Sequence, residues 1–263
     1  MPLPYYIARK LEHQRAEQDE LSMFSAGSAN DDKNRHLWVK GASLYINQIN
    51  NLLEYVDYDF NIVNITDFVS DYDKLGNILA NNKSDKSTSH NYHIIYSYIF
   101  NQLGVDSNLN ILEIGLGTNN PDLVSSMGVT GRPGASIYGF REYLPNSNIY
   151  GADIDRDILF ESDRIKTCFV DQLDSNTFNE INQKFGNIKY DLIVDDGLHS
   201  IGANLNTLLF ALKNLNEKGW IVIEDIHIVN NWKAIDYILN NNKKYKTYVV
   251  KTKVSHIYVV NKL

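Results

Sequence analysis

The sequence contains a single cysteine, Cys168, among 263 residues. One cysteine excludes an internal disulfide and any zinc site built from several cysteines. Cys168 lies in a short apolar run at residues 167–170, and free thiols in such runs are among the most buried side chains. We therefore predict a buried thiol of the core.

Long apolar runs and an excess of basic residues are also lacking. No stretch approaches the roughly 18 apolar residues of a membrane span, and the first residues lack the basic start and apolar core of a signal peptide. The formal net charge is -7 at pH 7, whereas general nucleic-acid binders carry a basic excess. We expect a cytoplasmic protein with no membrane span and no nucleic-acid partner.

Residues 1–85 differ in character from the rest of the chain. Apolar residues recur at helical spacing between residues 5 and 24 and between residues 44 and 56, and the polar stretch at 25–41 indicates a loop. This part shows no chemical motif of its own. We predict a helical extension over residues 1–85, which serves as a lid or as the contact of a homodimer, and a second domain over residues 86–263.

The stretch at residues 110–121 organises the second domain. Ile111, Leu112 and Ile114 form an apolar run that stops at Gly115, the pattern of a buried strand that turns into a glycine-rich loop. Glycines at 115 and 117 permit positive φ and allow a ligand to lie against the backbone. Glu113 would repel a phosphate, but it can accept hydrogen bonds from a hydroxyl or bind a cationic group.

Four further predicted strands end in acidic residues. Ligands of open α/β sheets bind at the carboxyl ends of the strands, so we expect these acids to share one crevice with Glu113. A carboxylate after the second strand can accept from both ribose hydroxyls, while a plain strand-end turn accounts equally well for Asp171. The residues are Asp153, with Asp155 in reserve, then Asp171, then Asp195 and Asp196 followed by His199, and finally Glu224 and Asp225 followed by His227.

Two β-rich runs, at residues 245–251 and 254–262, suit an antiparallel hairpin at a sheet edge. Taken with the strand, acid and helix pattern before them, they predict an α/β fold with a Rossmann-like, mostly parallel sheet. Five motifs in order make residues 86–263 similar to the class I S-adenosylmethionine-dependent methyltransferases, beginning with Glu113-Ile-Gly-Leu-Gly. That resemblance implies seven strands with a C-terminal antiparallel hairpin.

Two runs resemble particular subgroups. Asp-Asp-Gly-Leu-His at residues 195–199, with Glu-Asp after the fifth strand, resembles macrolide sugar O-methyltransferases. Gly-Val-Thr-Gly-Arg-Pro-Gly-Ala-Ser at residues 128–136 resembles methyltransferases of bacterial capsule and surface-glycan clusters, among them Campylobacter capsule methyltransferases linked to O-methyl phosphoramidate. The acceptor implied is a capsular polysaccharide precursor, as a glycan or nucleotide-linked small molecule, methylated on a sugar hydroxyl or a phosphoramidate oxygen.

The resemblance also implies a role for each motif. The donor is S-adenosyl-L-methionine, whose methyl group is already activated, so that the protein mainly has to align it with the nucleophile. His199 matches the general base, and an imidazole suits that task at neutral pH. The implied catalytic residues are His199, Asp196 and Asp195. The implied donor-binding residues are Glu113, Gly115 and Gly117 for the methionine part, Asp153 for the ribose, Asp171 for the adenine, and Asp195.

Magnesium is implied by the same subgroup, in which carboxylates that match Asp196 and Asp225 bind the ion. The subgroup has a further metal-binding glutamate before the first motif, and Ser97 stands in its place here. Asp195 or Glu224 could substitute, and we include Glu224 with Asp196 and Asp225 as the candidate metal ligands. The alternative is that Asp196 and Asp225 order Arg or His side chains without a metal.

Other residues are candidates for acceptor binding. Residues 85–92 resemble a segment before the first motif of sugar O-methyltransferases; the alternative is a polar helix start with an exposed histidine. Arg132, near the end of the long insert at residues 118–135, and Arg141, just after it, could clamp an anion, unless they are surface residues. The candidate substrate-binding residues are Arg141, Arg132, His90, Tyr92 and His227.

Two other functions are compatible with such a sheet. A nicotinamide-dependent oxidoreductase would be expected to contain a phosphate-binding Gly-x-Gly-x-x-Gly motif. Here Asn120 stands at the position of the third glycine, and Pro121 follows it. A non-catalytic binding subunit predicts loss of the donor-site acids, yet Glu113 and Asp153 are both present. The methyltransferase is therefore the favoured function.

Overall fold

The computed structural model describes residues 32–56, 58–123 and 126–263, and in this part of the chain nine strands form one sheet. Their order is β1-β8-β9-β7-β6-β2-β3-β5-β4. β9 runs antiparallel to β7 and β8, and β4 antiparallel to β5; the other neighbours are parallel. The strands are β1 (Ile62–Asn64), β2 (Asn110–Ile114), β3 (Asn148–Asp153), β4 (Glu161–Ser162), β5 (Ile165–Phe169), β6 (Tyr190–Asp195), β7 (Leu215–Ile226), β8 (Tyr245–Lys251) and β9 (His256–Lys262).

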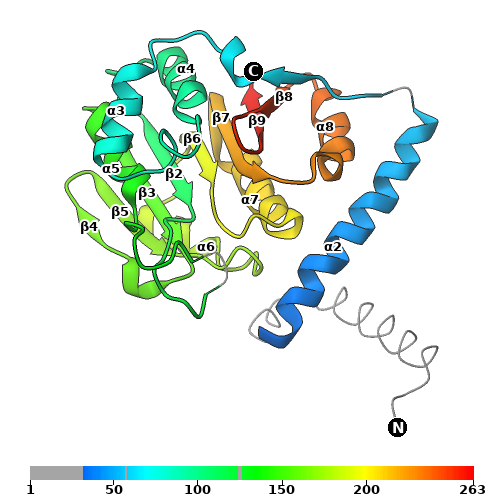
Figure 1. Ribbon diagram of the computed structural model, residues 1–263, viewed down its shortest axis with the longest axis horizontal. Helices are drawn as coiled ribbons and strands as arrows, with labels where there is room; N and C mark the ends of the chain where they lie inside the picture. Colours follow the sequence, from blue (N-terminus) through cyan, green and yellow to red (C-terminus); the bar gives the residue numbers. More distant parts are fainter. Residues whose placement is uncertain (1–31, 57, 124–125) are drawn as a thin grey trace.

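Helices cover both faces of this sheet (Figure 1). Successive side chains of a strand point to opposite faces, so Ile111 packs with one layer of helices and Leu112 with the other. Both layers are apolar, which explains why the central strands are continuous hydrophobic runs. One layer holds α3 (Asp73–Asn81), α4 (His93–Leu103) and α5 (Ala135–Tyr143); the other holds α2 (Asp32–Leu52), α6 (Asn179–Phe185), α7 (Ile201–Asn214) and α8 (Lys233–Asn240).

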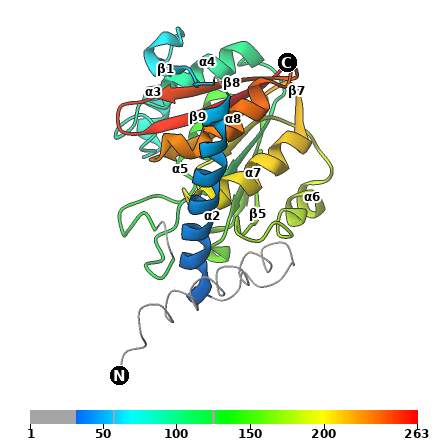
Figure 2. The same ribbon diagram turned by 90° about the vertical axis from the view of Figure 1, so that its right-hand side faces the viewer.

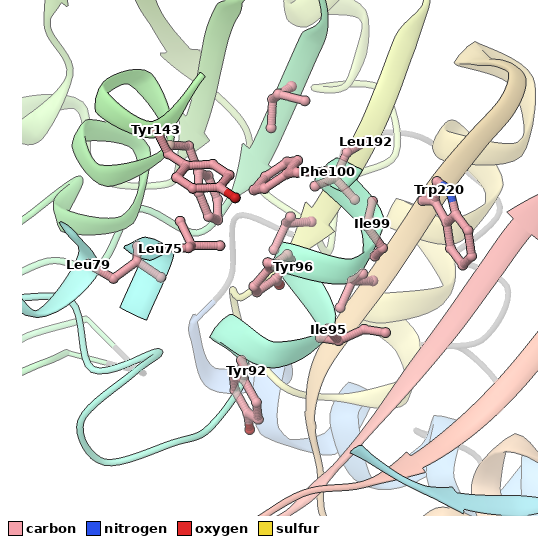
Figure 3. Close-up of a cluster of buried hydrophobic side chains, with 14 of the residues drawn as sticks. Leu75, Leu79, Tyr92, Ile95, Tyr96, Ile99, Phe100, Tyr143, Leu192 and Trp220 are labelled. Atoms are coloured by element: carbon pink, nitrogen blue, oxygen red, sulfur yellow. The ribbon is translucent and has the colours of Figure 1, made fainter. Parts of the chain in front are cut away.

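The first layer is centred on α4 (Figure 3). Ile95, Ile99 and Phe100 of this helix are fully buried, and they lie between α3 and the strands β6 and β7. Burying an aliphatic or aromatic side chain of this size contributes roughly 1.5–3 kcal/mol. The packing therefore fixes the start of α4, including Tyr92 and the loop before it, against the middle of the sheet.

The second layer contains the lone cysteine. Cys168 on β5 is buried and unpaired, as predicted. Burial raises the pKa of its thiol to about 12. A thiol held in its neutral form is a poor nucleophile, so Cys168 is a packing residue.

Part of the stretch 1–85 belongs to the sheet and its helical layers. β1 pairs in parallel with β8, and α3 packs on α5. α2 runs along the outside, against α7 and α8, and buries Ile46 (Figure 2). The side-chain oxygen of Asn50 accepts from the backbone N–H of Ala234 at 2.9 Å.

Three further expectations can be compared with these elements. The sheet has the predicted mostly parallel arrangement and C-terminal hairpin, and β1 and β4 add short strands at its two edges. The loop predicted at 25–41 is wrong from Asp32 onward, where α2 already begins, because polar residues also suit the solvent side of a helix. The helix predicted at 5–24 lies outside the described residues.

The parallel strands bring their carboxyl ends to one edge of the sheet. β2 is flanked by β6 on one side and by β3 on the other. The chain segments that follow these strands therefore leave the carboxyl end of β2 in opposite directions. Such a switch point leaves a crevice in which ligands of open α/β sheets bind. None of the helices described combines the length and the apolar character that crossing a membrane would take.

Candidate active site

The turn after β2 forms the floor of the site. Gly115 and Gly117 both have positive φ, 92° and 77°. A Cβ on Gly115 would lie 2.2 Å from the backbone oxygen of Asp196, so no larger residue fits between the ends of β2 and β6. The backbone N–H of Leu116 donates to Oδ2 of Asp153 at 2.7 Å, which holds the turn against the end of β3.

A cavity opens over this turn at the carboxyl ends of β2, β3, β5 and β6. Five of the predicted site residues lie in its wall, and Ile154, Val170 and Leu198 add apolar surface. The cavity therefore combines carboxylates, bare backbone and an apolar patch, which suits a nucleoside with a cationic group. The five predicted residues are Gly115, Gly117, Asp153, Asp171 and Asp196.

The carboxylate of Asp153 is nearly buried, and both of its oxygens accept hydrogen bonds from the backbone. Its Oδ1 accepts from the N–H of Asp155 at 2.8 Å. Burial raises the pKa of Asp153, and the bonds from the backbone N–H groups of Asp155 and Leu116 oppose this rise. Asp171 is buried as well, and its Oδ1 accepts from the N–H of Leu173 at 3.0 Å. Both acids thus have orientations fixed by the backbone.

Asp195 stands behind the cavity wall. Its side chain is fully buried and accepts from Gln172 Nε2 at 2.7 Å and from Asn204 Nδ2 at 3.1 Å. Gln172, which sequence reasoning did not single out, also accepts from the N–H of Leu198 at 2.8 Å. Asp195 therefore supports the cavity from behind, and Asp196 lies in the cavity wall instead.

Glu113 is also behind the wall, in an acidic cluster around a buried ammonium. Its Oε2 accepts from Ser136 Oγ at 2.6 Å, and its Oε1 lies 3.3 Å from Nζ of Lys86. The same Nζ lies 2.6 Å from Asp196 Oδ2 and 2.6 Å from Glu224 Oε2. The carboxyl ends of three neighbouring strands, β2, β6 and β7, are thus joined by one lysine.

Burial dominates the electrostatics of this cluster. It raises the pKa of Glu113 and of Glu224, and Lys86 opposes the rise in both cases. Burial alone would lower the pKa of Lys86, but the three carboxylates outweigh burial and raise it. Lys86 is therefore charged in the folded protein. Lys86 lies within the segment at residues 85–92 that the sequence analysis compared with sugar O-methyltransferases, but it was not predicted as a site residue. Tyr96, which donates to Glu224, was not predicted either.

A second group lies beside the cavity. Asp196, His199 and Asp225 each offer one ligand atom within 4.8 Å of the others. His199 Nε2 is 3.9 Å from Asp196 Oδ1, and the buried Nδ1 of His199 has no hydrogen-bond partner. Two carboxylates and an imidazole with open positions fit a divalent cation or a proton-transfer group.

The segment before α4 contacts this group at Asp225. Tyr92 donates to Asp225 Oδ1 at 2.7 Å, and His90 stacks on Tyr92 with Nδ1 4.0 Å from the same oxygen. Burial acts to raise the pKa of Asp225, but the bonds from Tyr92 and Ser255 and the nearby histidines outweigh it, so that the pKa is lowered.

Five residues named in the sequence analysis lie apart from this group. Both oxygens of Glu224 are bonded, to Lys86 and to Tyr96, and Glu224 is not in the candidate metal group of the described residues. Ser97, where the subgroup has a glutamate, donates to the backbone oxygen of Asp71 at 2.8 Å. Arg132 and Arg141 both lie over the ring of Tyr138, outside the cavity wall. His227 is exposed two residues beyond Asp225.

The chain is similar to curated sugar O-methyltransferases. It is 28% identical over 154 residues, 58% of its length, to the 8-demethyl-8-(2-methoxy-alpha-L-rhamnosyl)-tetracenomycin-C 3'-O-methyltransferase of Streptomyces olivaceus. It is 33% identical over 94 residues, 35% of its length, to the mycinamicin VI 2''-O-methyltransferase of Micromonospora griseorubida. These alignments cover 36% and 23% of the two relatives, so the chain spans only part of their length. No protein-family model matches the chain.

Solved structures share its fold. The MycE methyltransferase of the mycinamycin biosynthetic pathway, in complex with Mg and SAH, superposes with a TM-score of 0.56 at 21% identity, over 73% of this chain and 55% of MycE. A second MycE complex, with Mg, SAH and mycinamycin VI, gives a TM-score of 0.58 at 19% identity, over the same shares of the two chains. The predicted fold is confirmed: the chain has the Rossmann-like fold of the class I methyltransferases.

Proposed function

We propose that the chain is an S-adenosyl-L-methionine-dependent methyltransferase that methylates an oxygen atom of a glycan precursor. The observation that carries this proposal is the position of Asp196. It lines the cavity above the glycine turn and also belongs to the group with His199 and Asp225. A proton-accepting group is therefore adjacent to the place where the donor would lie.

The donor would be held by the cavity. When bound, it supplies a methyl group on a sulfonium and brings no phosphate, which agrees with a turn flanked by carboxylates. Asp153 would accept from the ribose hydroxyls, with Ile154 and Val170 against the nucleoside. Gly115 and Gly117 expose backbone to the methionine part. Glu113 would not contact the donor directly, because its carboxylate is buried behind the turn and does not reach the cavity wall.

The acceptor would be activated by the neighbouring group. His199 is half-buried, and its imidazole can take the proton of an acceptor hydroxyl. Asp196 and Asp225 would hold a divalent cation, and such an ion lowers the pKa of a bound hydroxyl. An acceptor with an anionic phosphoryl oxygen would need no base, and His199 would then orient it.

The acceptor itself is proposed from the relatives, whose names specify sugar oxygens. A capsular polysaccharide precursor, free or nucleotide-linked, with a sugar hydroxyl or a phosphoramidate oxygen as the methylated atom, remains our prediction. His90 and Tyr92, which lie next to Asp225, are our candidates for its recognition. A homodimer also remains a prediction, and the exposed apolar side chains Leu44, Ile49 and Leu52 of α2 offer a contact for it.

Calorimetry with S-adenosylhomocysteine tests the proposal. We expect binding by the wild-type protein and at least tenfold weaker binding by Asp153→Ala, because the variant lacks the buried acceptor for the ribose. Asp163→Ala removes a carboxylate that is 85% exposed and serves as the control, with unchanged affinity. No binding at millimolar ligand would refute the function, and equal affinity of the two variants would refute the ribose assignment.

A further inference from the structure

Lys86 is a buried cation without a role in the chemistry described so far. Its side chain is 2% exposed, and its ammonium contacts Glu113, Asp196 and Glu224. Lysine is almost never fully buried unless it is paired, because removing its charge from water is costly. One carboxylate would be enough to neutralise the ammonium, so the three that surround it are more than charge pairing requires.

The oxygens around Lys86 divide into two groups. The inner group consists of Glu113, Glu224 and Oδ2 of Asp196, whose other contacts are Ser136 for Glu113 and Tyr96 for Glu224. The outer group consists of Oδ1 of Asp196 with His199 and Asp225. Asp196 is the one residue shared between them, and Lys86 holds only its inner oxygen.

The inner group resembles a cation site in its chemistry. Carboxylate oxygens from three strand ends converge on Nζ at 2.6 to 3.3 Å. Hard divalent ions prefer oxygen ligands at about 2.0–2.6 Å, so small shifts would adapt the same oxygens to a metal. With the ammonium in place, that space is already occupied by a positive charge.

We propose that Lys86 is a positioning residue of the site: its ammonium fills the inner group, keeps a divalent cation out of it, and orients Asp196 so that Oδ1 alone faces the outer group. This inference rests on the proposed function and adds to it a role for Lys86. It assigns Glu224 to the inner group and Asp225, its neighbour in sequence, to the outer group.

The two neighbours provide the first test, with Mn²⁺ as the probe in the absence of donor. We expect Asp225→Asn to weaken Mn²⁺ binding, measured by electron paramagnetic resonance, at least tenfold. Glu224→Gln, which keeps the size of the side chain, should change it less than threefold. If Glu224→Gln weakens binding as strongly as Asp225→Asn does, Glu224 is a metal ligand and the inference is wrong.

Removing the ammonium provides the second test. Lys86→Met keeps the length of the side chain, and we expect the variant to bind one more Mn²⁺ per chain than the wild type. The double variant Lys86→Met with Glu224→Gln should return to the wild-type number, because the inner group has then lost a ligand. Lys166→Met, at an exposed position on β5, is the control. An unchanged ion count in Lys86→Met would overturn the inference.

Two further measurements keep the outcomes separate. Thermal unfolding shows whether Lys86→Met folds; if it does not, the comparison of Glu224→Gln with Asp225→Asn decides. Calorimetry with S-adenosylhomocysteine on the same samples tests the proposed function. Failure of the wild type to bind this ligand refutes the methyltransferase, whereas the ion counts and affinities bear on Lys86 alone.

Discussion

His199 and Asp225 have left-handed backbones, with φ of 53° and 52°. For residues with a Cβ this conformation costs roughly 1–2 kcal/mol, and it persists where the surroundings impose it. Tyr92 and Ser255 hold the side chain of Asp225. Ser200, directly after His199, caps α7 by accepting from the N–H of Ala203 at 3.4 Å. Strained backbone near the ends of β6 and β7 thus orients the two side chains that we propose act in the chemistry.

A substitution at His199 tests its role as a base. We expect His199→Asn to lower the rate of methyl transfer by about a hundredfold or more, the usual contribution of a general base. Asparagine tolerates a left-handed backbone, so the turn should survive. The rate is measured with any acceptor that the wild type methylates, and the affinity for S-adenosylhomocysteine should stay within about threefold. A rate loss below about tenfold would show that His199 is not a general base and would leave it only the role of orienting the acceptor.

At the scale of elements, the turn after β2 depends on the absence of a side chain. A Cβ at residue 115 would meet the backbone of Asp196 and Gly197, which cannot move aside without shifting the end of β6. We expect Gly115→Ala to lower the free energy of unfolding by about 1–3 kcal/mol, the usual cost of forcing extra atoms into a packed site. Urea denaturation measures the change.

Gly41 is the matched control for that experiment. It lies within α2, and a Cβ there would have nothing within 4 Å. Gly41→Ala should therefore raise the free energy of unfolding by about 0.5–1 kcal/mol, because alanine loses less conformational freedom in a helix. If both variants are equally stable, the close approach of the ends of β2 and β6 is not a constraint.

The elements that could be predicted are those with strong patterns. β2 and β6 are buried on both faces, and their apolar runs marked them in the sequence. β1 and β4 are short edge strands, and β1 obtains its partner, β8, from the far end of the chain. A run of three residues carries no periodicity of its own, so only the assembled sheet reveals it.

The site could be predicted only in part, for a related reason. Asp153, Asp171 and Asp196 follow strands in sequence, and parallel strands bring their ends together. Lys86 and Tyr96 reach the cluster from a loop and a helix, and no spacing rule relates them to Glu224. Glu113 and Asp195 were expected to touch the donor, but their side chains are fully buried behind the wall.

At the scale of the whole molecule, buried acids make stability depend on pH. In the folded protein burial raises the pKa of Glu113 above its ordinary value of 4.5. Between the ordinary and the raised pKa, Glu113 is more protonated in the folded than in the unfolded state, so the stability that it contributes falls as the pH rises through this window. Glu113→Gln removes this titration.

We expect the stability of Glu113→Gln, relative to the wild type, to increase between about pH 5 and about pH 8. Urea unfolding at the two pH values gives the difference. Glu217→Gln, at a side chain that is 74% exposed, should show no such trend. A relative stability of Glu113→Gln that stays constant or decreases with pH would contradict the raised pKa.

The place of β9 has a consequence for synthesis in the cell. β9 lies between β7 and β8, so both of these strands lack a neighbour until residues 256–262 have left the ribosome. Strands with unpaired edges bind other chains readily. Until β9 pairs with both strands, a nascent chain of this protein therefore exposes two open strand edges, and we expect it to associate with other chains most readily in that interval.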